Sequence, residues 1–351
     1  MIGERLKLAR ASTGLSLRGL AERLGNLVTA QALGKYERDE MLPSSTVLMA
    51  LSEALSVPES YLLSTGQLHI EDVEFRKLKV TGVKGQAALR AQVLRHAERY
   101  LEVEDLLAAE SVEWKAPTNF PYRVSSVDQA ETAADRLRQA WLLGQDPIPQ
   151  LGEFLEERGI KVLSLELAET ISGMAARVKR SSARSANVIV VNKLHPGERQ
   201  RFTLAHELGH LVLQAGGELK MEDACNRFAG AFLVPASMLI AEVGQKRHNI
   251  SLGELVRLKK LFLVSIQCLI YRLKDLDVIS QPLFAQMFAL MNKLKIRKNE
   301  PEALPKETTQ RFERLCFRAF TESIISASKA AELLDVTVRR LDQMLEAKAG
   351  A

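Results

Sequence analysis

The sequence lacks the features that mark secreted, disulfide-stabilised or membrane-spanning proteins. It has only three cysteines, Cys225, Cys268 and Cys316, and none of them stands in a C-x-x-C pattern. Each lies in an apolar helical context, which is typical of small buried residues in a reducing cytoplasm. No apolar run approaches the roughly 18 residues that a membrane helix needs. The N-terminal stretch MIGERLKLAR is charged and unlike a signal peptide, so we expect a cytoplasmic protein without a membrane partner.

The composition predicts a folded protein of more than one domain. The 351 residues are 46% apolar, which is enough for a sizeable core. Helical periodicity dominates, and only two short stretches resemble strands. We therefore expect a mainly α fold with a small β-sheet, in the α+β class. The net charge of +5 permits an acidic partner but does not establish one.

Histidine is also scarce, with six residues, yet two of them stand four positions apart within RQRFTLAHELGHLV, Arg199 to Val212. On a helix, His206 and His210 project from the same face. Two neutral imidazoles can then bind one metal ion while Glu207 stays free beside it. In such an H-E-x-x-H helix the glutamate takes a proton from metal-bound water and passes it to the leaving amine. The alternative is a surface helix with two solvated histidines, which the apolar flanks disfavour.

A catalytic zinc site needs a third protein ligand and one open position for water. The candidates on the following element are Glu218, Glu222, Asp223 and His248. Glu218 follows two glycines and is expected in a turn, whereas His248 has an ordinary loop context. Glu222 opens the next periodic run, MEDACNRFAGAFLVP, and shares one helical stripe with Asn226. We choose Glu222 as the third ligand and Asp223 as the second choice. This ligand set suits Zn²⁺ and can also hold Mn²⁺ or Fe²⁺.

The two motifs together resemble the ImmA/IrrE family of metallo-endopeptidases. RQRFTLAHELGH follows the family pattern R-F-x-x-A-H-E-x-G-H, and EDACNRFAGAFLVP follows its E-x-x-A-N-x-F-A and L-x-x-P patterns. The resemblance implies that His206, His210 and Glu222 are metal ligands and that Glu207 is the catalytic base. It also implies a narrow protein substrate, commonly a repressor or an antitoxin-like protein. Cys225 departs from the family, which usually has alanine at this position.

Residues 3–63 divide into five short amphipathic helices separated by turn residues. Ser16 and Thr29 are the expected N-caps of the second and third helices. The stretches LSLRGLAERLG, QALGKYER and VPESYLL resemble the Xre (Cro/cI-type) helix-turn-helix domain over its full length. The resemblance implies binding to a double-stranded DNA operator, and we expect a homodimer because a single module neutralises few phosphates.

The expected DNA contacts lie at the start of the third of these helices. Gln31 is the best base reader, since its amide can pair with adenine through two hydrogen bonds. Ala30 can touch a thymine methyl group, and Thr29, Lys35 and Arg18 are expected to hold phosphates. Residues 1–65 contain seven Lys/Arg and seven Asp/Glu, so the domain is not net basic. A helix-turn-helix used for dimerisation or protein contact is the alternative.

Two stretches rich in β-branched residues predict strands, 160–167 and 187–192 (NVIVVN). Metallopeptidases of this general type often bind an extended substrate by adding it to a strand edge, and NVIVVN is our candidate for that edge. The stretch between the strands is basic, with Arg177, Lys179, Arg180 and Arg184. We interpret it as a solvated loop, with contact to an acidic substrate or to the DNA backbone as the alternative.

The rest of the chain predicts helices. A short ordered piece at 73–77 precedes a long helix at 86–107, which either mediates dimerisation or packs on the peptidase domain. After Pro235, SLGELVRLKKLFLVSIQCLIYRL and ISASKAAELLDVTVRRLDQML both have the rhythm of a helix-turn-helix. We expect four parts: a helix-turn-helix domain at 1–65, a linker and long helix at 66–118, a metallopeptidase domain at 119–240, and a helical accessory domain at 241–351.

The function that these predictions favour is a transcriptional regulator with a zinc-dependent endopeptidase domain, whose activity can be latent. Two rivals exist. One is a DNA-binding transcription factor whose metal site is sensory or silent, and the other is a fused toxin–antitoxin component. The intact motif favours chemistry, because a purely structural metal site would not need Glu207.

Overall fold

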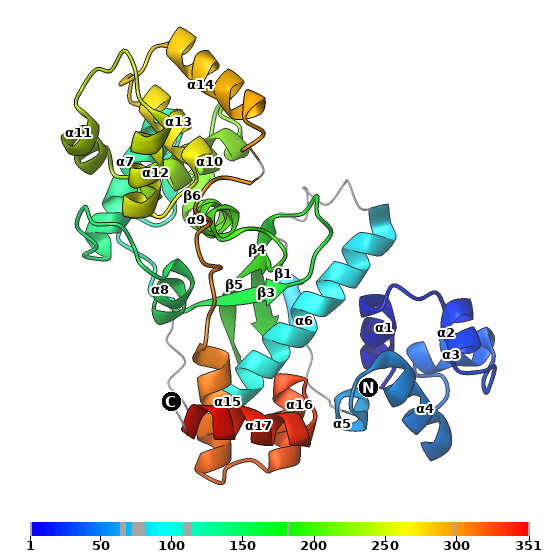
Figure 1. Ribbon diagram of the computed structural model, residues 1–351. Helices are drawn as coiled ribbons and strands as arrows, with labels where there is room; N and C mark the ends of the chain where they lie inside the picture. The colour runs from blue at the N-terminus through cyan, green and yellow to red at the C-terminus, as the bar shows by residue number, and fades with distance from the viewer. Residues whose placement is uncertain are drawn as a thin grey trace. The chain divides into compact units, whose positions relative to one another are not determined.

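The computed structural model describes residues 2–63, 68–71, 82–107, 114–180, 183–297 and 299–349 (Figure 1). The chain forms two compact units. The terminal unit contains Met1–Ser111, Arg177–Ser185 and Arg311–Ala351, and the central unit contains Val112–Ala176 and Ala186–Gln310. Most described residues are helical and a small sheet is present, which confirms the predicted α+β class. The four-part division by sequence stays a prediction.

The N-terminal helices form a small bundle in the terminal unit. Ser16, Thr29 and Ser44 each accept a hydrogen bond from a backbone N–H of the helix that they precede, as their N-cap positions predict. The bundle core includes Leu20, Leu33 and other completely buried leucines. The helices are α1 (Ile2–Ser12), α2 (Leu17–Arg23), α3 (Ala30–Glu37), α4 (Ser45–Leu55) and α5 (Glu59–Leu63).

The long helix α6 (Gly82–Leu106) joins this bundle to the C-terminal helices within the terminal unit. Leu89, Val93, Ala97 and Tyr100 on this helix are buried. Arg5 of α1 pairs with Glu98 of α6, and Lys329 pairs with Glu102 of α6. The predicted ordered piece at 73–77 lies outside the described residues. The C-terminal helices are α15 (Arg311–Thr321), α16 (Ala327–Leu334) and α17 (Val338–Ala349).

The main sheet has the strand order β1–β4–β5–β3. Its strands are β1 (Leu68–Glu71), β3 (Ile160–Leu165), β4 (Gly173–Arg180) and β5 (Ala183–Asn192). β3 runs parallel to β5, from Ile160 opposite Asn187 to Leu165 opposite Asn192. The prediction that NVIVVN is an edge strand is wrong, because β5 is hydrogen-bonded to β4 on one side and to β3 on the other. Residue periodicity predicts a strand but not its neighbours.

The basic stretch between the two predicted strands is not a loop. Arg177 lies in β4, which the sequence did not predict, and the backbone of Lys179 and Arg180 continues that strand opposite β1. Arg184 lies in β5. The side chains of Lys179, Arg180 and Arg184 lie outside the described residues. The sequence did not predict this strand because its basic residues are typical of a solvated loop and two of its buried residues, Ala175 and Ala176, are small.

The central unit packs its helices around one continuous apolar core. Leu208, Phe228, Phe232 and Leu269 are completely buried in it. The elements of this unit besides the main-sheet strands are β2 (Tyr122–Val124), α7 (Val127–Ala140), α8 (Leu151–Glu157), α9 (Gly197–Val212), β6 (Leu213–Ala215), α10 (Met221–Leu233), α11 (Ala236–Val243), α12 (Leu252–Phe262), α13 (Ile266–Asp275) and α14 (Gln281–Lys293). β2 and β6, neither of them predicted, pair in parallel as a second sheet.

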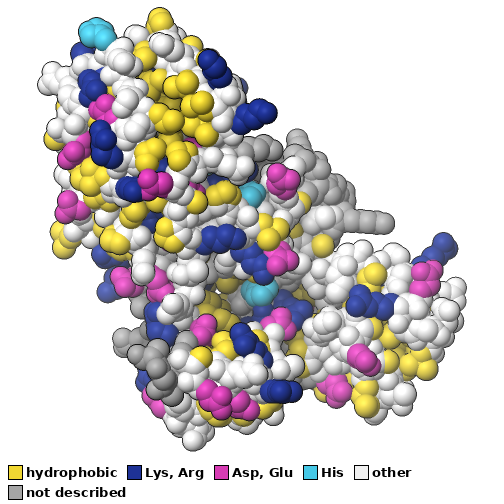
Figure 2. All heavy atoms as spheres, in the orientation of Figure 1, with side chains coloured by type: hydrophobic (Ala, Val, Ile, Leu, Met, Phe, Trp, Pro, Cys, Tyr) yellow, Lys and Arg dark blue, Asp and Glu magenta, His cyan; other side chains and the backbone are white. Residues whose placement is uncertain are grey.

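No single helix in the described ranges is long and apolar enough to cross a membrane, and only the bent pair α10–α11 meets that test jointly. Exposed apolar side chains do occur on α13 and α14. Tyr271 is 52% exposed and its ring contacts Phe284 and Phe288 at centroid distances of 5.2 and 5.3 Å. Figure 2 shows apolar side chains gathered over this part of the central unit.

An extended segment, residues 299–310, runs beside the N-terminal half of α9 and is called the strap here (orange in Figure 1). Glu198 of α9 accepts the backbone N–H of Leu304, and Gln200 accepts that of Glu307. Gly197 is needed at the contact, because a Cβ there would lie 2.0 Å from the carbonyl oxygen of Pro305. The strap therefore holds the start of α9 by specific hydrogen bonds.

A partly buried carboxylate on α7, that of Glu131, connects three helices of the central unit. Glu131 accepts hydrogen bonds from Arg227 of α10 at 2.6 Å and from two nitrogens of Arg272 of α13 at 2.9 Å. Burial by itself raises the pKa of Glu131, but the bonds and charges of Arg272 and Arg227 outweigh it and hold the pKa below the ordinary 4.5.

The lowered pKa of Glu131 predicts a pH-dependent stability difference between wild type and Glu131→Gln. Above pH 4.5 the carboxylate contributes fully, and the contribution is lost as the pH falls through the lower, folded-state pKa. We expect urea unfolding at pH 7 to show the variant less stable by about 3 kcal/mol, because the buried Arg272 loses its carboxylate partner and Arg227 loses one of its carboxylate partners. The gap should narrow steadily below pH 4.5. A gap that stays constant from pH 7 to pH 3 would contradict this account.

Candidate metal centre and DNA-binding face

The H-E-x-x-H helix α9 lies deep in the central unit. Only Arg199 and Phe202 of its residues are not classed as buried. One side of the helix, with Leu204 and Leu208, enters the apolar core. His206, Glu207 and His210 are also buried, with exposed fractions of 7%, 5% and 7%. Buried polar groups need partners, so this face of α9 must be occupied by specific contacts.

Helix α10 approaches α9 closely at Gly209. A Cβ on this glycine would lie 3.2 Å from the Sγ and 3.3 Å from the Cα of Cys225. The glycine of the H-E-L-G-H sequence therefore lets the two helices touch along their backbones. This contact places the first turn of α10, which carries Glu222, beside the two histidines.

The two histidines and Glu222 form a compact triangle of donor atoms. The Nε2 atoms of His206 and His210 are 3.2 Å apart. The carboxylate oxygens of Glu222 lie 3.6 Å from the Nε2 of His206 and 3.4 Å from that of His210. Donors placed at about 2.0–2.1 Å around a tetrahedral zinc ion are separated by roughly 3.3–3.4 Å. Two imidazoles and one carboxylate in this arrangement fit such an ion.

The ring orientation of His206 is set by a residue to which the sequence assigned no role. The Nδ1 of His206 donates a hydrogen bond of 2.9 Å to the Oδ1 of Asn226 on α10. With the proton on Nδ1, the Nε2 lone pair points toward His210 and Glu222. Partners of this kind fix the tautomer of a metal-binding histidine. Asn226 follows Glu222 by four residues, and that helical spacing was the available sequence evidence.

The other candidate ligands lie in different surroundings. Asp223 is exposed on α10, Glu218 lies in the turn before it, and His248 is exposed in a loop. Cys225, which was expected to be a small buried hydrophobe, also lies close to the histidines. Its Sγ and one ring nitrogen each of His206 and His210 lie within 4.8 Å of one another. The structure thus brings Glu222 and Cys225 to the histidines, and the sequence predicted only the first.

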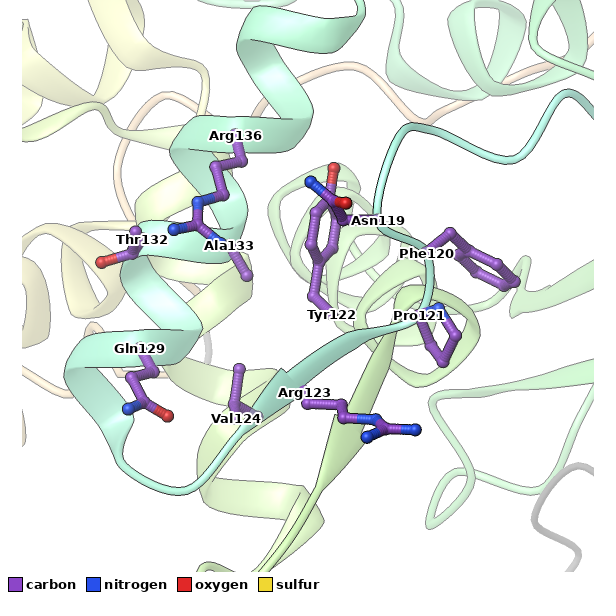
Figure 3. A pocket seen from close by; sticks show the side chains of 10 residues that line it. All are labelled: Asn119, Phe120, Pro121, Tyr122, Arg123, Val124, Gln129, Thr132, Ala133 and Arg136. Atoms are coloured by element: carbon purple, nitrogen blue, oxygen red, sulfur yellow. The ribbon is translucent and has the colours of Figure 1, made fainter.

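A separate hollow of about 730 Å³ lies between β2 and α7 (Figure 3). Its lining residues include Asn119, Tyr122, Arg123 and Arg136 but none of the predicted metal residues. In Figure 3 the side chain of Arg123 points away from the hollow, whereas that of Arg136 lies along α7 near Thr132 and Ala133. Burial raises the pKa of the Tyr122 hydroxyl, and the positive charge of Arg136 works against that rise. We assign no function to this hollow.

The predicted DNA contacts lie on the surface of the N-terminal bundle. Arg18, Thr29, Gln31 and Lys35 are exposed and Ala30 is partly exposed, whereas Leu33 of the same helix is buried. The hydroxyl of Thr29 accepts a hydrogen bond from the backbone N–H of Ala32, so it also caps α3. The contacts of these residues with DNA stay a prediction.

Comparison with known proteins identifies two domains in the chain, one peptidase-like and one helix-turn-helix. Residues 155–274 match the family model of the IrrE N-terminal-like domain, peptidase M78, and residues 6–62 match the helix-turn-helix family model. The chain is also 43% identical over 63 residues to an SPbeta prophage-derived uncharacterized HTH-type transcriptional regulator, YonR, of Bacillus subtilis (strain 168). That match covers 18% of this chain and 56% of the relative. No solved structure matches the chain significantly.

The chain therefore combines an Xre-type helix-turn-helix domain with an IrrE/ImmA-like peptidase domain. The first domain is that of a DNA-binding regulator, and the second is metallopeptidase-like. Because the curated relative is matched over only about half of its length, it supports the DNA-binding domain and not the function of the whole chain.

The hydrogen bond from His206 predicts that Asn226→Ala weakens metal binding. We expect zinc affinity, measured by competition with a chromogenic chelator, to fall about 10- to 100-fold, because the imidazole loses its fixed tautomer. Asp223→Ala, an exposed change on the same helix, is the control and should leave the affinity unchanged. Equal affinities for the two variants would show that Asn226 does not position His206.

The close contact at Gly209 predicts that Gly209→Ala displaces α10 from α9. The added methyl group cannot be accommodated at 3.2–3.3 Å from Cys225 without a shift of the helix that carries Glu222. We expect lower thermal stability and weaker zinc binding in the same variant. Gly216→Ala, at a site where no atom lies within 4 Å of the added Cβ, serves as the matched substitution. If Gly209→Ala binds zinc as tightly as Gly216→Ala does, the close contact at Gly209 is not needed to place Glu222 beside the histidines.

Proposed function

We propose that this protein is a transcriptional regulator whose central unit is a zinc-dependent endopeptidase that cleaves a repressor or antitoxin-like protein. The observation that supports the proposal most is the donor triangle of His206, His210 and Glu222, with sides of 3.2, 3.6 and 3.4 Å. Glu207 lies next to this triangle in the sequence and is buried with it. Manganese is an alternative ion for the same donors.

In the proposed reaction, His206, His210 and Glu222 would hold the metal. When bound, the ion would supply Lewis acidity, which lowers the pKa of water and polarises the scissile carbonyl. The carboxylate of Glu207 would act as the general base and would pass its proton to the leaving amine. Asn226 keeps the Nε2 of His206 available by holding the proton on Nδ1. The side chain of Glu222 is 43% exposed, so substrate can approach from the side on which Glu222 lies.

The substrate would add to the first half of β4, Gly173–Ala176, in place of the incorrectly predicted β5 edge. Gly173 lies against Thr203 of α9, one turn before His206, and a Cβ there would be 2.5 Å from the Thr203 methyl group. Among the residues that the structure describes, the pairing of β1 with β4 involves residues 177–180 of β4. An extended peptide bound here would be held by backbone hydrogen bonds, which do not depend on its sequence.

The N-terminal domain would bring this peptidase to DNA in the cytoplasm. Gln31 and Ala30 would contact bases, and Arg18, Thr29 and Lys35 would contact phosphates of a double-stranded operator. We propose a homodimer, because the domain itself carries no net positive charge and two copies double the number of phosphate contacts.

The second candidate function is a DNA-binding transcription factor with a silent or sensory metal site. Cys225 favours it, because its Sγ lies within 4.8 Å of the histidine donors and offers a fourth ligand. A fourth protein ligand would close the coordination sphere, which is the arrangement of structural zinc sites. In that case Cys225→Ala would weaken metal binding, whereas the peptidase hypothesis predicts that it does not.

The proposal predicts that Glu207→Gln abolishes cleavage and keeps the metal, because the amide cannot accept the proton of water. Wild type and variant would each be incubated with purified repressors and antitoxin-like proteins encoded beside the gene. Zinc content is measured in both, and intact mass follows the cut. We expect one bound metal in each and cleavage by wild type alone, with loss of cleavage after chelation. Metal in both proteins and no cut by wild type would favour the second candidate.

A further inference from the structure

The last two helices of the chain repeat the local geometry of the N-terminal helix-turn-helix. In both pairs a serine caps the first helix, Ser16 before α2 and Ser326 before α16. Nine positions after each serine stands a residue with positive φ, Gly25 at 62° and Asp335 at 60°. A threonine then caps the second helix: Thr29 accepts the N–H of the residue three positions later, and Thr337 does the same.

The buried positions of the two pairs also correspond. Ala21 and Ala331 follow their serines by five residues and are 5% and 3% exposed. Leu33 and Leu341 follow their threonines by four residues and are completely buried. These small and apolar residues fill the angle between the two helices of each pair. The correspondence therefore extends from the caps to the packing.

The outer face of α17 carries side chains suited to DNA. Thr337, Val338, Arg339, Arg340 and Gln343 are all exposed. Counted from the capping threonine, they correspond to Thr29, Ala30, Gln31, Ala32 and Lys35 of the N-terminal pair. Arginine pairs with guanine or phosphate, and glutamine with adenine. Of the acidic residues of α17, the exposed Asp342 stands between Arg340 and Gln343, and Glu346 follows both, as Glu37 follows Lys35 in α3.

A third pair of helices, α12 and α13, has a similar order of caps, but most residues of its second helix are buried. Ser251 and Ser265 cap α12 and α13, and Leu263 between them has a φ of 54°. Yet Cys268, Ile270 and Arg272 of α13 are all buried, so this second helix cannot enter a DNA groove. The pairs α12–α13 and α16–α17 share a similar order of caps in the sequence, and the burial of their second helices distinguishes them.

Helix α6 braces the turn of α16–α17 against the N-terminal bundle. The Nη2 of Arg95 donates to the carboxylate of Asp335 at 3.2 and 3.1 Å and to the backbone oxygen of Ser56 at 3.2 Å. Arg99 pairs with Asp335 as well. One guanidinium thus contacts residues from both helix-turn-helix segments of the terminal unit.

We propose that α16–α17 is a second DNA-binding helix-turn-helix, which inserts the start of α17 into the major groove of duplex DNA. Arg339 and Arg340 supply the phosphate or guanine contacts, and Gln343 supplies an amide contact. The inference goes beyond the proposed peptidase and does not depend on it. Since the two motifs of one chain carry different contact residues, the protein recognises two different base sequences within one site.

The test measures DNA binding by the full chain with a fluorescein-labelled 40-base-pair duplex of random sequence, by anisotropy from 50 to 200 mM salt. The variants are Arg339→Ala/Arg340→Ala in α17 and Gln31→Ala/Lys35→Ala in α3. Lys293→Ala/Lys295→Ala removes the same charge from exposed positions at and after the end of α14 and is the matched control. All six substituted residues are exposed, so folding is checked simply by circular dichroism.

We expect the α17 variant to bind about 10-fold more weakly and its salt slope to fall by about two, because two phosphate contacts are lost. The α3 variant should keep salt-dependent binding, and combining the α3 and α17 changes should abolish it. The control should bind within twofold of wild type. The proposal is overturned if the α17 variant matches wild type in affinity and slope. It is equally overturned if that variant changes only the oligomeric mass, which would identify α17 as a protein-docking helix.

Discussion

Backbone contact between α9 and α10 at Gly209 is the constraint on which the candidate metal centre depends. Two histidines one turn apart can provide only two ligands, and the third must come from another helix. Cys225 packs where the side chain of residue 209 would otherwise stand, with its Sγ 3.2 Å from the position of an added Cβ. This separation places Glu222, three residues before Cys225, and Asn226, one residue after it, on the two sides of His206. Ligand and orienting residue therefore come from the same short helix.

The polar face of α9 is held in place by charged groups as well as by apolar packing. Lys259 of α12 is completely buried and bonds both Glu198 of α9 and Glu300 of the strap. Arg201 of α9 pairs with Glu307 of the strap, which also accepts the backbone N–H of Gly152. Buried ion pairs of this kind add little net stability, but any arrangement that separates the two partners leaves a buried charge without a counter-charge. The pairs therefore favour one position of the strap on α9. The strap, which is hydrogen-bonded to α9, continues along the chain directly into α15, the helix that precedes α16–α17.

Sequence reasoning succeeded where local chemistry decides the structure. Ser16 and Thr29 were predicted as caps and accept the expected backbone hydrogen bonds. Helical spacing placed His206, His210 and Glu222 on faces that can meet. It failed where tertiary neighbours decide: NVIVVN reads as a strand whichever strands flank it, and β4 is disguised by its small and basic residues. The sequence of the strap shows no helical or strand periodicity and no known motif. Its backbone N–H groups bond to side chains of α8 and α9, which are far from it in the sequence. The proximity of Cys225 to the histidines depends on how two helices cross.

The most direct test of the central claim is zinc-edge X-ray absorption on the metal-loaded full chain. The account predicts one zinc per chain with a first shell of nitrogen and oxygen at about 2.0–2.1 Å, including two imidazoles, and no sulfur. The same spectrum should persist in Cys225→Ala and should be lost with the metal in His210→Ala. A scatterer at about 2.3 Å would identify Cys225 as a ligand and a closed, non-catalytic site. A wild-type chain that binds no zinc would contradict the metal centre itself.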